Sequence, residues 1–240
     1  MSNDITAAQV EKELRKLGKP AKAKVLSGFF KTGKGEYGEG DKFLGVTVPI
    51  QRNVAKKYSE LDLNEIAKLI QNPVHECRLT GLEILVMQYE KAKKCGNITL
   101  QEKIIAFYLK NTKYINNWDL VDATAPYMLG DWLLNNDRDI LYMFVKSKKL
   151  WERRISIIST YAFIRAGDFK DTIKISELLL KDSHDLMHKA VGWMLREVGK
   201  RDELVLMRFL NTHAHMMPRT ALRYAIEKFP ESRRKAYLNR

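Results

Sequence analysis

The stretch NEIAKLIQNPVHECRLTGLEILVMQYEKAKKCGNITLQEKIIAFYL, residues 64–109, decides the fold of this chain. Its apolar residues recur at the spacing of one face of an α-helix. Asn72-Pro73 and the turn at 94–97 divide it into three helical segments, and Thr99 is expected to cap the third. The three apolar faces consist of Ile66, Leu69 and Ile70; of Leu82, Leu85, Val86 and Tyr89; and of Ile104, Ile105, Tyr108 and Leu109.

Similar segments continue toward the C-terminus. Asn116 or Asn117 is expected to cap a helix that runs to about residue 135, and no segment shows the sustained alternation of a strand. Helix pairs that recur every roughly 30–40 residues are typical of HEAT-like solenoids, although an irregular helical bundle gives the same local signals. We therefore predict an all-α fold, a right-handed superhelical solenoid of HEAT-like helix pairs. The expected pairs are 138–147 with 151–166, 170–181 with 184–199, and 202–213 with 217–228.

The first 47 residues have a different pattern. Two helices, at about 6–17 and 20–30, are expected to lead into the loop KTGKGEYGEGDK at 31–42, and Pro49 to lie in the first turn of the next helix. We treat the chain as one HEAT-like repeat domain, 1–240, with the N-terminal helices and Gly-rich loop at 1–47 and the helix-pair repeats at 48–240.

The Gly-rich loop matches the pattern GxGxxG at Gly33, Gly35 and Gly38. A dinucleotide site needs a strand before this pattern and a helix that starts within it, whereas here a helix precedes it. We therefore expect a mobile loop instead of a cofactor site. Its lysines, with Lys34 and Lys42 as candidates, can contact a phosphate backbone.

The composition is that of a basic globular protein. Lys and Arg number 42 against 29 Asp and Glu, which leaves a formal net charge of +13. Such an excess favours a polyanionic partner, most often nucleic acid and sometimes an acidic membrane face. A hydrophobic content of 45% excludes collagen-like and wholly disordered chains. With no membrane-spanning run and no secretory signal in the sequence, we expect a cytoplasmic protein.

No metal site, cofactor or nucleophile is indicated. His184 and His188 have the spacing of a metal-binding pair, but no Glu follows His184, and Cys77 and Cys95 supply no matching ligands. Neither cysteine lies in a sequence typical of a reactive thiol, and no GxSxG motif or Ser-His-Asp set is evident.

The most distinctive segment is YINNWDLVD, residues 114–122. Asp119 suits the first turn of a helix, whereas Asp122 lies four residues after Trp118, so that carboxylate and indole share one helical face. WERR at 151–154 and WMLR at 193–196 each place a tryptophan and an arginine three residues apart. These pairs suit base stacking with phosphate contacts, or alternatively core tryptophans covered by arginine stems.

At these motifs the sequence resembles the AlkD-type alkylpurine DNA glycosylases, bacterial HEAT-like-repeat proteins of DNA alkylation repair. The resemblance extends over nearly the whole chain, and KAVGWMLRE is its most specific motif. The segments that carry it are KFLGVTVPIQR (42–52), WDLVD (118–122), LGDW (129–132), WERR (151–154) and KAVGWMLRE (189–197).

The resemblance implies a role for particular residues. Trp118 and Trp193 match the tryptophans that flank the lesion, and Asp122 matches the carboxylate beside its deoxyribose. Arg154 and Arg196 match arginines that hold the phosphate backbone, and we add Arg153, Lys34 and Lys42 as candidate DNA contacts. The chain departs from the family at two DNA-facing positions, where Phe29 and Thr47 stand in place of Tyr and Gln.

The implied activity is that of a monofunctional DNA glycosylase. It would hydrolyse the N-glycosidic bond of cationic N3- or N7-alkylated purines in duplex DNA, as a monomer in the bacterial cytosol or nucleoid, with no cofactor and no membrane partner. The alternative is a family member that binds distorted or branched DNA without excising bases, which would tolerate Asn at Asp122. A protein–protein scaffold is a third possibility, because HEAT solenoids commonly serve as one.

Overall fold

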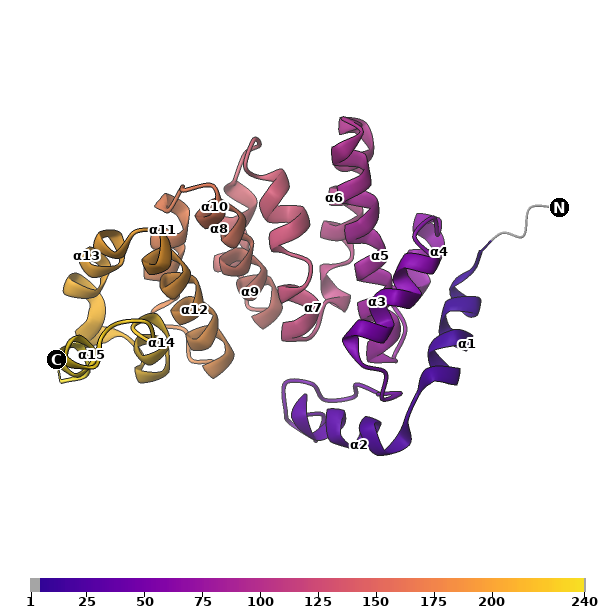
Figure 1. Ribbon diagram of the computed structural model, residues 1–240, viewed down its shortest axis with the longest axis horizontal. Helices are drawn as coiled ribbons and strands as arrows, with labels where there is room; N and C mark the ends of the chain where they lie inside the picture. Colours follow the sequence, from indigo (N-terminus) through magenta and orange to yellow (C-terminus); the bar gives the residue numbers. More distant parts are fainter. Residues whose placement is uncertain (1–4, 240) are drawn as a thin grey trace. The chain divides into compact units, whose positions relative to one another are not determined.

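The computed structural model describes residues 5–239, and every regular element in that range is helical, which confirms the all-α prediction (Figure 1). Most helices pack against helices one or two places away along the chain, as in an α-solenoid. The chain divides into two compact units, of which the first ends at Thr124 and the second begins at Ala125. The handedness of the superhelix and the single domain stay predictions.

The first unit is built around one long central helix, α5. This helix buries most of its residues from His75 to Val86, and α3, α4 and α6 pack against it. Thr6 caps α1 in a capping box with Gln9, and Asp62 caps α4. The helices of this unit are α1 (Ala7–Leu17), α2 (Pro20–Phe29), α3 (Val48–Lys57), α4 (Leu63–Ile70), α5 (His75–Lys94), α6 (Ile98–Lys110), the 3-10 turn η1 (Thr112–Tyr114) and α7 (Trp118–Asp122).

The second unit is built around α12, against which α9, α11, α13 and α14 pack. His184 caps α12 by accepting from the amide of Leu186, and Asp202 caps α13. The helices of this unit are the π-helical turn η2 (Pro126–Gly130), α8 (Asp139–Val145), α9 (Leu150–Ser159), α10 (Tyr161–Arg165), α11 (Lys170–Leu179), α12 (Asp185–Arg201), α13 (Glu203–His213), the 3-10 turn η3 (Ala214–Met216), α14 (Arg219–Ala225) and α15 (Glu231–Leu238).

Three local expectations were wrong. Asn97, not Thr99, caps α6, because its side chain accepts from the amide of Leu100. The helix expected to run from Asn117 to about residue 135 ends at Asp122, and a turn and η2 follow. Pro126 is the first residue of η2, and a proline has no N–H with which to continue a regular helix. The segment expected as one helix at 151–166 is split at Thr160 into α9 and α10.

Gly192 lets α12 and α14 approach closely. A Cβ atom at this position would lie 2.5 Å from the carbonyl oxygen of Ala221 and 2.5 Å from Cβ of Tyr224. Any larger residue would force the helices apart, so the glycine of KAVGWMLRE serves the packing of the second unit.

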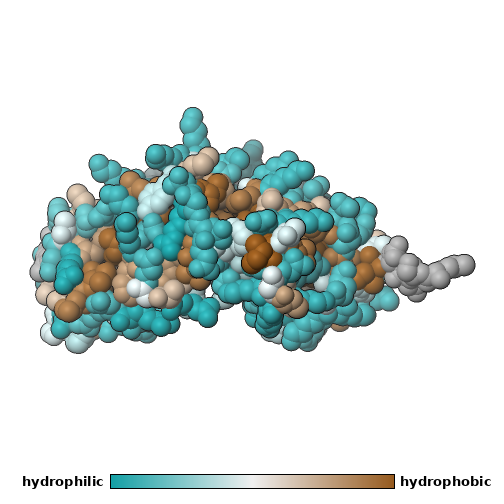
Figure 2. Space-filling view, turned by 90° about the horizontal axis from the view of Figure 1, so that it is seen from above, coloured by the Kyte–Doolittle hydropathy of each residue, from teal (hydrophilic) through white to brown (hydrophobic). Residues whose placement is uncertain are grey.

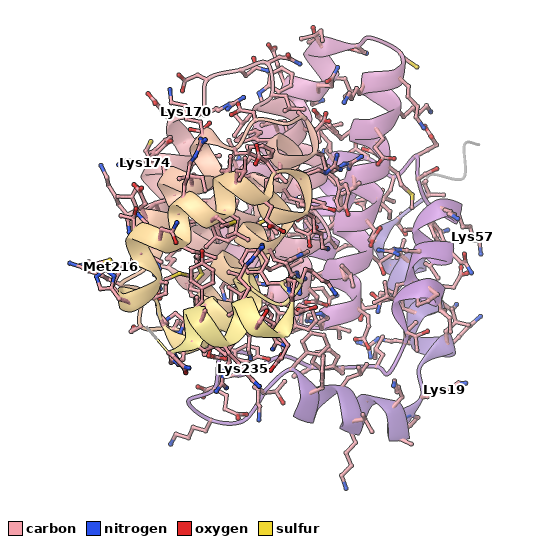
Figure 3. The ribbon with its side chains drawn as sticks, turned by 60° about the vertical axis from the view of Figure 1, so that its left-hand side comes forward. Lys19, Lys57, Lys170, Lys174, Met216 and Lys235 are labelled. Carbon is pink, nitrogen blue, oxygen red and sulfur yellow. The ribbon has the colours of Figure 1, made fainter. Side chains whose placement is uncertain are left out.

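The surface is largely hydrophilic. On the face in Figure 2, hydrophilic side chains predominate, and hydrophobic residues appear between them in separate small patches. The lysines labelled in Figure 3 are exposed and come from both units. None of the helices within residues 5–239 is both long and apolar enough to cross a membrane.

Candidate functional site

Trp118 begins α7 and lies against a group of aromatic rings from the N-terminal segment. Its indole stacks on Phe30 with ring centroids 5.2 Å apart and planes 19° apart, and Phe29 meets it edge-on at 5.9 Å. Phe30 is buried, whereas the ring of Phe29 at the end of α2 is 61% exposed. Trp118 is therefore supported on one side by a buried ring and lies beside an exposed one.

Asp119 and Asp122 leave the same short helix toward different partners. Asp119 accepts from the amide of Leu120 at 2.9 Å and from the ring of His75 at 2.8 Å, so it is part of the framework. Asp122 is half-buried, four residues after Trp118. Burial raises the pKa of the Tyr108 phenol, and the nearby charge of Asp122 raises this pKa further. The hydrogen bond between Tyr108 and Thr124 acts in the opposite direction but does not cancel the effect of burial. Tyr108 thus stays protonated beside the Asp122 carboxylate.

His75 links α5 to the loop before α3 and to α7. Its Nδ1 lies 3.0 Å from Oδ2 of Asp41 and its Nε2 lies 2.8 Å from Oδ2 of Asp119. Arg78, one turn further along α5, donates to Oδ1 of Asp41 at 2.6 Å. The ring of His75 also stacks on Phe43, with centroids 4.6 Å apart. This cluster fixes the start of α7 relative to α5 and to the N-terminal segment.

Glu76 shapes the segment that leads into α3. The fully buried carboxylate accepts hydrogen bonds from three successive amides, those of Leu44, Gly45 and Val46, at 2.8–3.2 Å. Gly45 has φ +85°, and a Cβ atom there would lie 2.2 Å from the carbonyl oxygen of Lys19, so only glycine fits. The segment KFLGVTVPIQR is thus bound to Glu76 through the main chain of residues 44–46.

The Gly-rich loop is held by its own side chains. The amide of Gly33 donates to Glu36 and the amide of Gly35 to Glu39, each at 2.8 Å. Lys34 and Lys42 are exposed. The preceding helix α2 buries none of its residues and contains Lys22 and Lys24 with no acidic residue, which makes this end of the first unit basic.

In the second unit, both arginines of WERR are engaged by the protein itself. Nε of Arg153 lies 2.6 Å from Oδ2 of Asp182, and its Nη1 donates to the carbonyl of Ser147 at 3.0 Å. Arg154 is 4% exposed, and its Nη1 donates at 2.7 Å to the carbonyl of Leu186, the second residue of α12. Contacts of either guanidinium with DNA stay a prediction.

Trp193 and Arg196 share α12 and one acidic neighbour. The indole Nε1 of Trp193 donates to Glu197 at 3.2 Å, and its ring lies 6.2 Å from that of Tyr161. Arg196 pairs with Glu227 of the segment after α14 and lies 3.5 Å from Glu197. The half-buried indole is thus oriented by a hydrogen bond, and the arginine is held in a small charged group.

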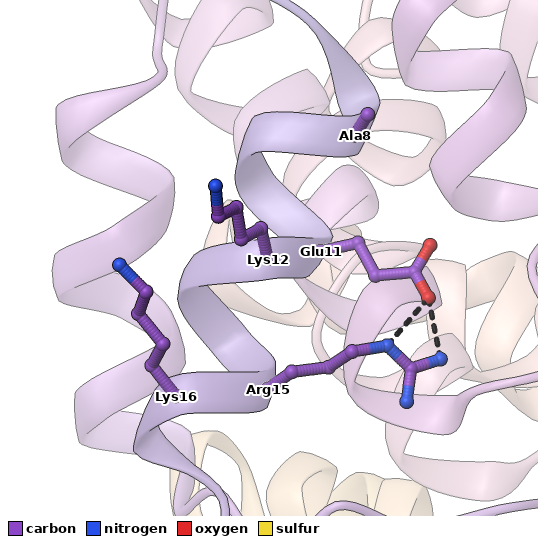
Figure 4. Close-up of a pocket in the computed structure, with 5 residues that line it drawn as sticks. All are labelled: Ala8, Glu11, Lys12, Arg15 and Lys16. Atoms are coloured by element: carbon purple, nitrogen blue, oxygen red, sulfur yellow. Dashed lines mark hydrogen bonds and ion pairs between the residues drawn. The ribbon is translucent and has the colours of Figure 1, made fainter.

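Other groups with chemical potential have structural roles. Within residues 5–239 there is no cluster of three or more metal-ligating side chains; His184 caps α12, and His188 bonds the carbonyl of Asp182. Burial raises the pKa of the Cys77 thiol to about 12, so this group is unreactive at neutral pH. A pocket on α1 is lined by residues of that helix alone, and its Arg15 is paired with Glu11 (Figure 4).

The sequence did not indicate His75, Asp41, Glu76 or Phe30 as parts of this region. Asp41 and Asp119 lie 34 and 44 residues from His75 along the chain, and no local spacing links them. The one available signal was the density of titratable residues in HECR, directly after the turn at Asn72-Pro73.

The fold is that of an α-solenoid, a class of proteins built from packed pairs of α-helices. The model of the family described as DNA alkylation repair enzyme matches residues 10–229. The chain therefore belongs to the DNA alkylation repair enzyme family, as the resemblance implied.

The structure is also similar to a protein described as a predicted DNA alkylation repair enzyme from Enterococcus faecalis, with a TM-score of 0.70 over 89% of this chain and 97% of that chain. At 17% identity this likeness shows the fold alone. Among curated proteins, none matches the sequence.

Proposed function

We propose that this protein is a monofunctional DNA glycosylase that releases cationic N3- and N7-alkylated purines from duplex DNA. The observation that carries the proposal is the pairing, on α7, of a supported indole and a half-buried carboxylate, Trp118 and Asp122. Family membership and a net charge of +13 support DNA as the substrate.

The chemistry suits an alkylpurine because such a base already carries a positive charge. Its glycosidic bond is weakened, and bond cleavage passes through a state that resembles an oxocarbenium ion. The carboxylate of Asp122 would stabilise that cation at the sugar and orient the attacking water. The face of Trp118 would hold the charged base by cation–π and van der Waals contact.

The proposal includes two limits on the activity. No acid is assigned to protonate a neutral leaving base, so uracil and neutral adenine adducts are expected to be poor substrates. No lysine is assigned as a Schiff-base nucleophile, so the product is an abasic site in an uncut strand. In the second unit, Trp193, Arg153, Arg154 and Arg196 are proposed as further contacts of the DNA.

The test is release of free 3-methyladenine and 7-methylguanine from N-methylated duplex DNA, measured by chromatography for wild type, Asp122→Asn and Glu102→Gln. Glu102 is exposed on α6 and serves as the matched carboxylate control. We expect wild type and the control to release both bases, and Asp122→Asn to lose release by at least about a hundredfold at unchanged DNA affinity. DNA binding without release by any of the three would instead support the alternative of a non-catalytic protein that binds distorted DNA.

A further inference from the structure

His75 contacts both the loop before α3 and the helix that carries the proposed site. We propose that His75 is a positioning residue: as an imidazolium, it donates to Asp41 and Asp119 at once and thereby fixes α7, with Trp118 and Asp122, on the aromatic support. The structural part stands on the geometry alone, whereas its effect on base release rests on the proposed function.

The two contacts of the ring require two protons. A neutral imidazole has a single N–H, and ionised carboxylates only accept hydrogen bonds. With Asp41 3.0 Å from Nδ1 and Asp119 2.8 Å from Nε2, a neutral ring would leave a nitrogen lone pair facing a carboxylate oxygen at one of these contacts. The protonated ring satisfies both contacts with charge-assisted hydrogen bonds.

The charges around the ring balance when His75 is protonated. The charged groups that face it are Asp41 of the loop, Asp119 of α7 and Arg78 of α5, whose Nη2 lies 3.5 Å from Nδ1. Two cations then meet two carboxylates in a buried cluster, in which His75 is 1% exposed. Loss of the proton would leave an uncompensated buried negative charge, which is costly.

The surroundings favour the charged form. Burial works against it, but the hydrogen bonds to Asp119 and Asp41 raise the pKa of His75 above its usual range. Burial likewise opposes ionisation of Asp41, yet the hydrogen bond from His75 and the charge of Arg78 bring its pKa below the usual range.

His75 reaches Trp118 by two routes. Asp119, which it binds, is the residue next to Trp118. Phe30, which stacks under the indole, also lies 4.9 Å from the imidazole, centroid to centroid. Phe43 also stacks on the imidazole, with the two planes 23° apart, an arrangement that favours a cation over an aromatic face. A change of charge at His75 therefore acts on both Asp119 and Phe30, the two residues through which His75 is connected to Trp118.

The sign of the pH dependence follows from the raised pKa. The stabilisation from this cluster is fully present below the unfolded-state pKa of 6.5 and is lost as the pH rises through the higher value in the folded protein. We expect α7 to loosen over that range, and base release to fall with it.

The first experiment needs no DNA. The full-length protein, labelled with 15N-histidine and 5-fluorotryptophan, is titrated by NMR from acid to alkaline pH, with His75 assigned by its loss in His75→Gln and Trp118 by its loss in Trp118→Phe. We expect both ring nitrogens of His75 to be protonated at neutral pH, and the fluorine signal of Trp118 to shift with the same midpoint. A singly protonated His75 at neutral pH, or a Trp118 signal that ignores its titration, would overturn the proposal.

Variants test the coupling directly. Asp119→Asn removes one of the two carboxylates and should lower the midpoint of His75, whereas exposed His215→Gln should leave it unchanged. His75→Gln, which can donate to only one carboxylate, should resemble alkaline wild type at every pH. If His75→Gln does not fold, His75 is assigned by elimination after substitution of the other four histidines, and the wild-type and Asp119→Asn titrations still decide. An unchanged midpoint in Asp119→Asn contradicts the proposal.

The consequence for base release is measured under single-turnover conditions. His75→Gln should lower the rate constant by about tenfold to a hundredfold, as misplaced reacting groups do, with little change in DNA affinity. His75→Arg, which keeps a positive donor between the carboxylates, should restore part of the rate and remove the pH dependence. Equal rates for wild type and His75→Gln would exclude the positioning role, whereas no release by any form would refute the proposed glycosylase and leave the NMR result standing.

Discussion

The indole of Trp118 and the phenyl ring of Phe30 are stacked, with centroids 5.2 Å apart and planes 19° apart. Phe29, the preceding residue, meets the same indole edge-on but leaves most of its own ring exposed. The two adjacent phenylalanines thus have different roles: buried Phe30 packs against the face of the indole, and exposed Phe29 lies on the surface beside it.

This division predicts different effects of the same substitution. Phe30→Ala should lower the free energy of unfolding by about 3 kcal/mol, because it empties a buried position in an aromatic cluster. Phe29→Ala should change it by less than about 0.5 kcal/mol, since the ring is exposed, and should weaken DNA binding instead. Chemical denaturation and DNA titration measure the two effects; equal stability losses would contradict the assignment.

The buried carboxylate of Glu76 should be essential to the first unit. Glu76→Gln turns an acceptor of three amide hydrogen bonds into a side chain whose NH2 group faces an amide N–H, and should destabilise the protein by about 2–3 kcal/mol. Glu90→Gln, at an exposed position of the same helix, is the control and should have little effect. If Glu76→Gln and Glu90→Gln have the same denaturant midpoint, the charge of the Glu76 carboxylate is not needed for stability.

Two glycine-to-alanine substitutions should have opposite signs. Gly192→Ala places a Cβ atom 2.5 Å from Ala221 and Tyr224, and overpacking of this kind costs about 1–3 kcal/mol. Gly28→Ala in α2 meets nothing within 4 Å and should stabilise the protein by about 0.5–1 kcal/mol through helix propensity. Thermal unfolding of both variants tests the pair, and a stable Gly192→Ala protein would mean that α12 and α14 can separate without loss.

The exposed lysines should affect DNA binding without affecting stability. If Lys34 and Lys42 each contact a phosphate, removing both should reduce the slope of log K against log salt by about 1.8. Lys103→Ala on α6 serves as a control for the loss of charge alone. An unchanged salt slope in the double variant would remove these two lysines from the DNA-contact set.

The acid side of the stability profile should depend on Asp41. Because the pKa of Asp41 is lowered in the folded protein, its contribution is present above the usual value of 3.8 and is lost as the pH falls through the lower folded value. Asp41→Asn should therefore unfold more easily at neutral pH and lose less further stability on acidification than wild type. Urea denaturation at a series of acidic pH values tests this, and parallel profiles for both proteins would argue against it.

The helical class and most helix positions could be predicted because apolar spacing is a local signal. The failures have local causes as well. Both Asn97 and Thr99 can cap a helix, and the stronger N-cap preference of Asn favours the position that the structure shows. Pro126 lies inside an otherwise helical apolar pattern, and whether the chain there bends or ends depends on packing. The last helix, α15, is strongly polar and was not predicted.

The candidate site was only partly predictable. The spacing of Trp118 and Asp122 predicted that they share one helical face, whereas their roles were implied only by the resemblance. The supports of that helix were not identified, because they come from three segments that only the fold brings together. The arginines were identified by type, but the sequence could not show that Arg153 and Arg154 bind Asp182 and Leu186 of the protein itself.

The amide hydrogen bonds that Glu76 accepts determine which nearby positions can change during evolution. Its hydrogen bonds go to main-chain amides, which every residue except proline supplies, so the half-buried side chain of Leu44 is free to drift while the path of the chain is preserved. Gly45 and Glu76 have no such latitude, since one is fixed by its backbone angle and the other by its charge. The backbone conformation that leads into α3 therefore depends on two residues, Gly45 and Glu76, and not on the side chains between them and the helix.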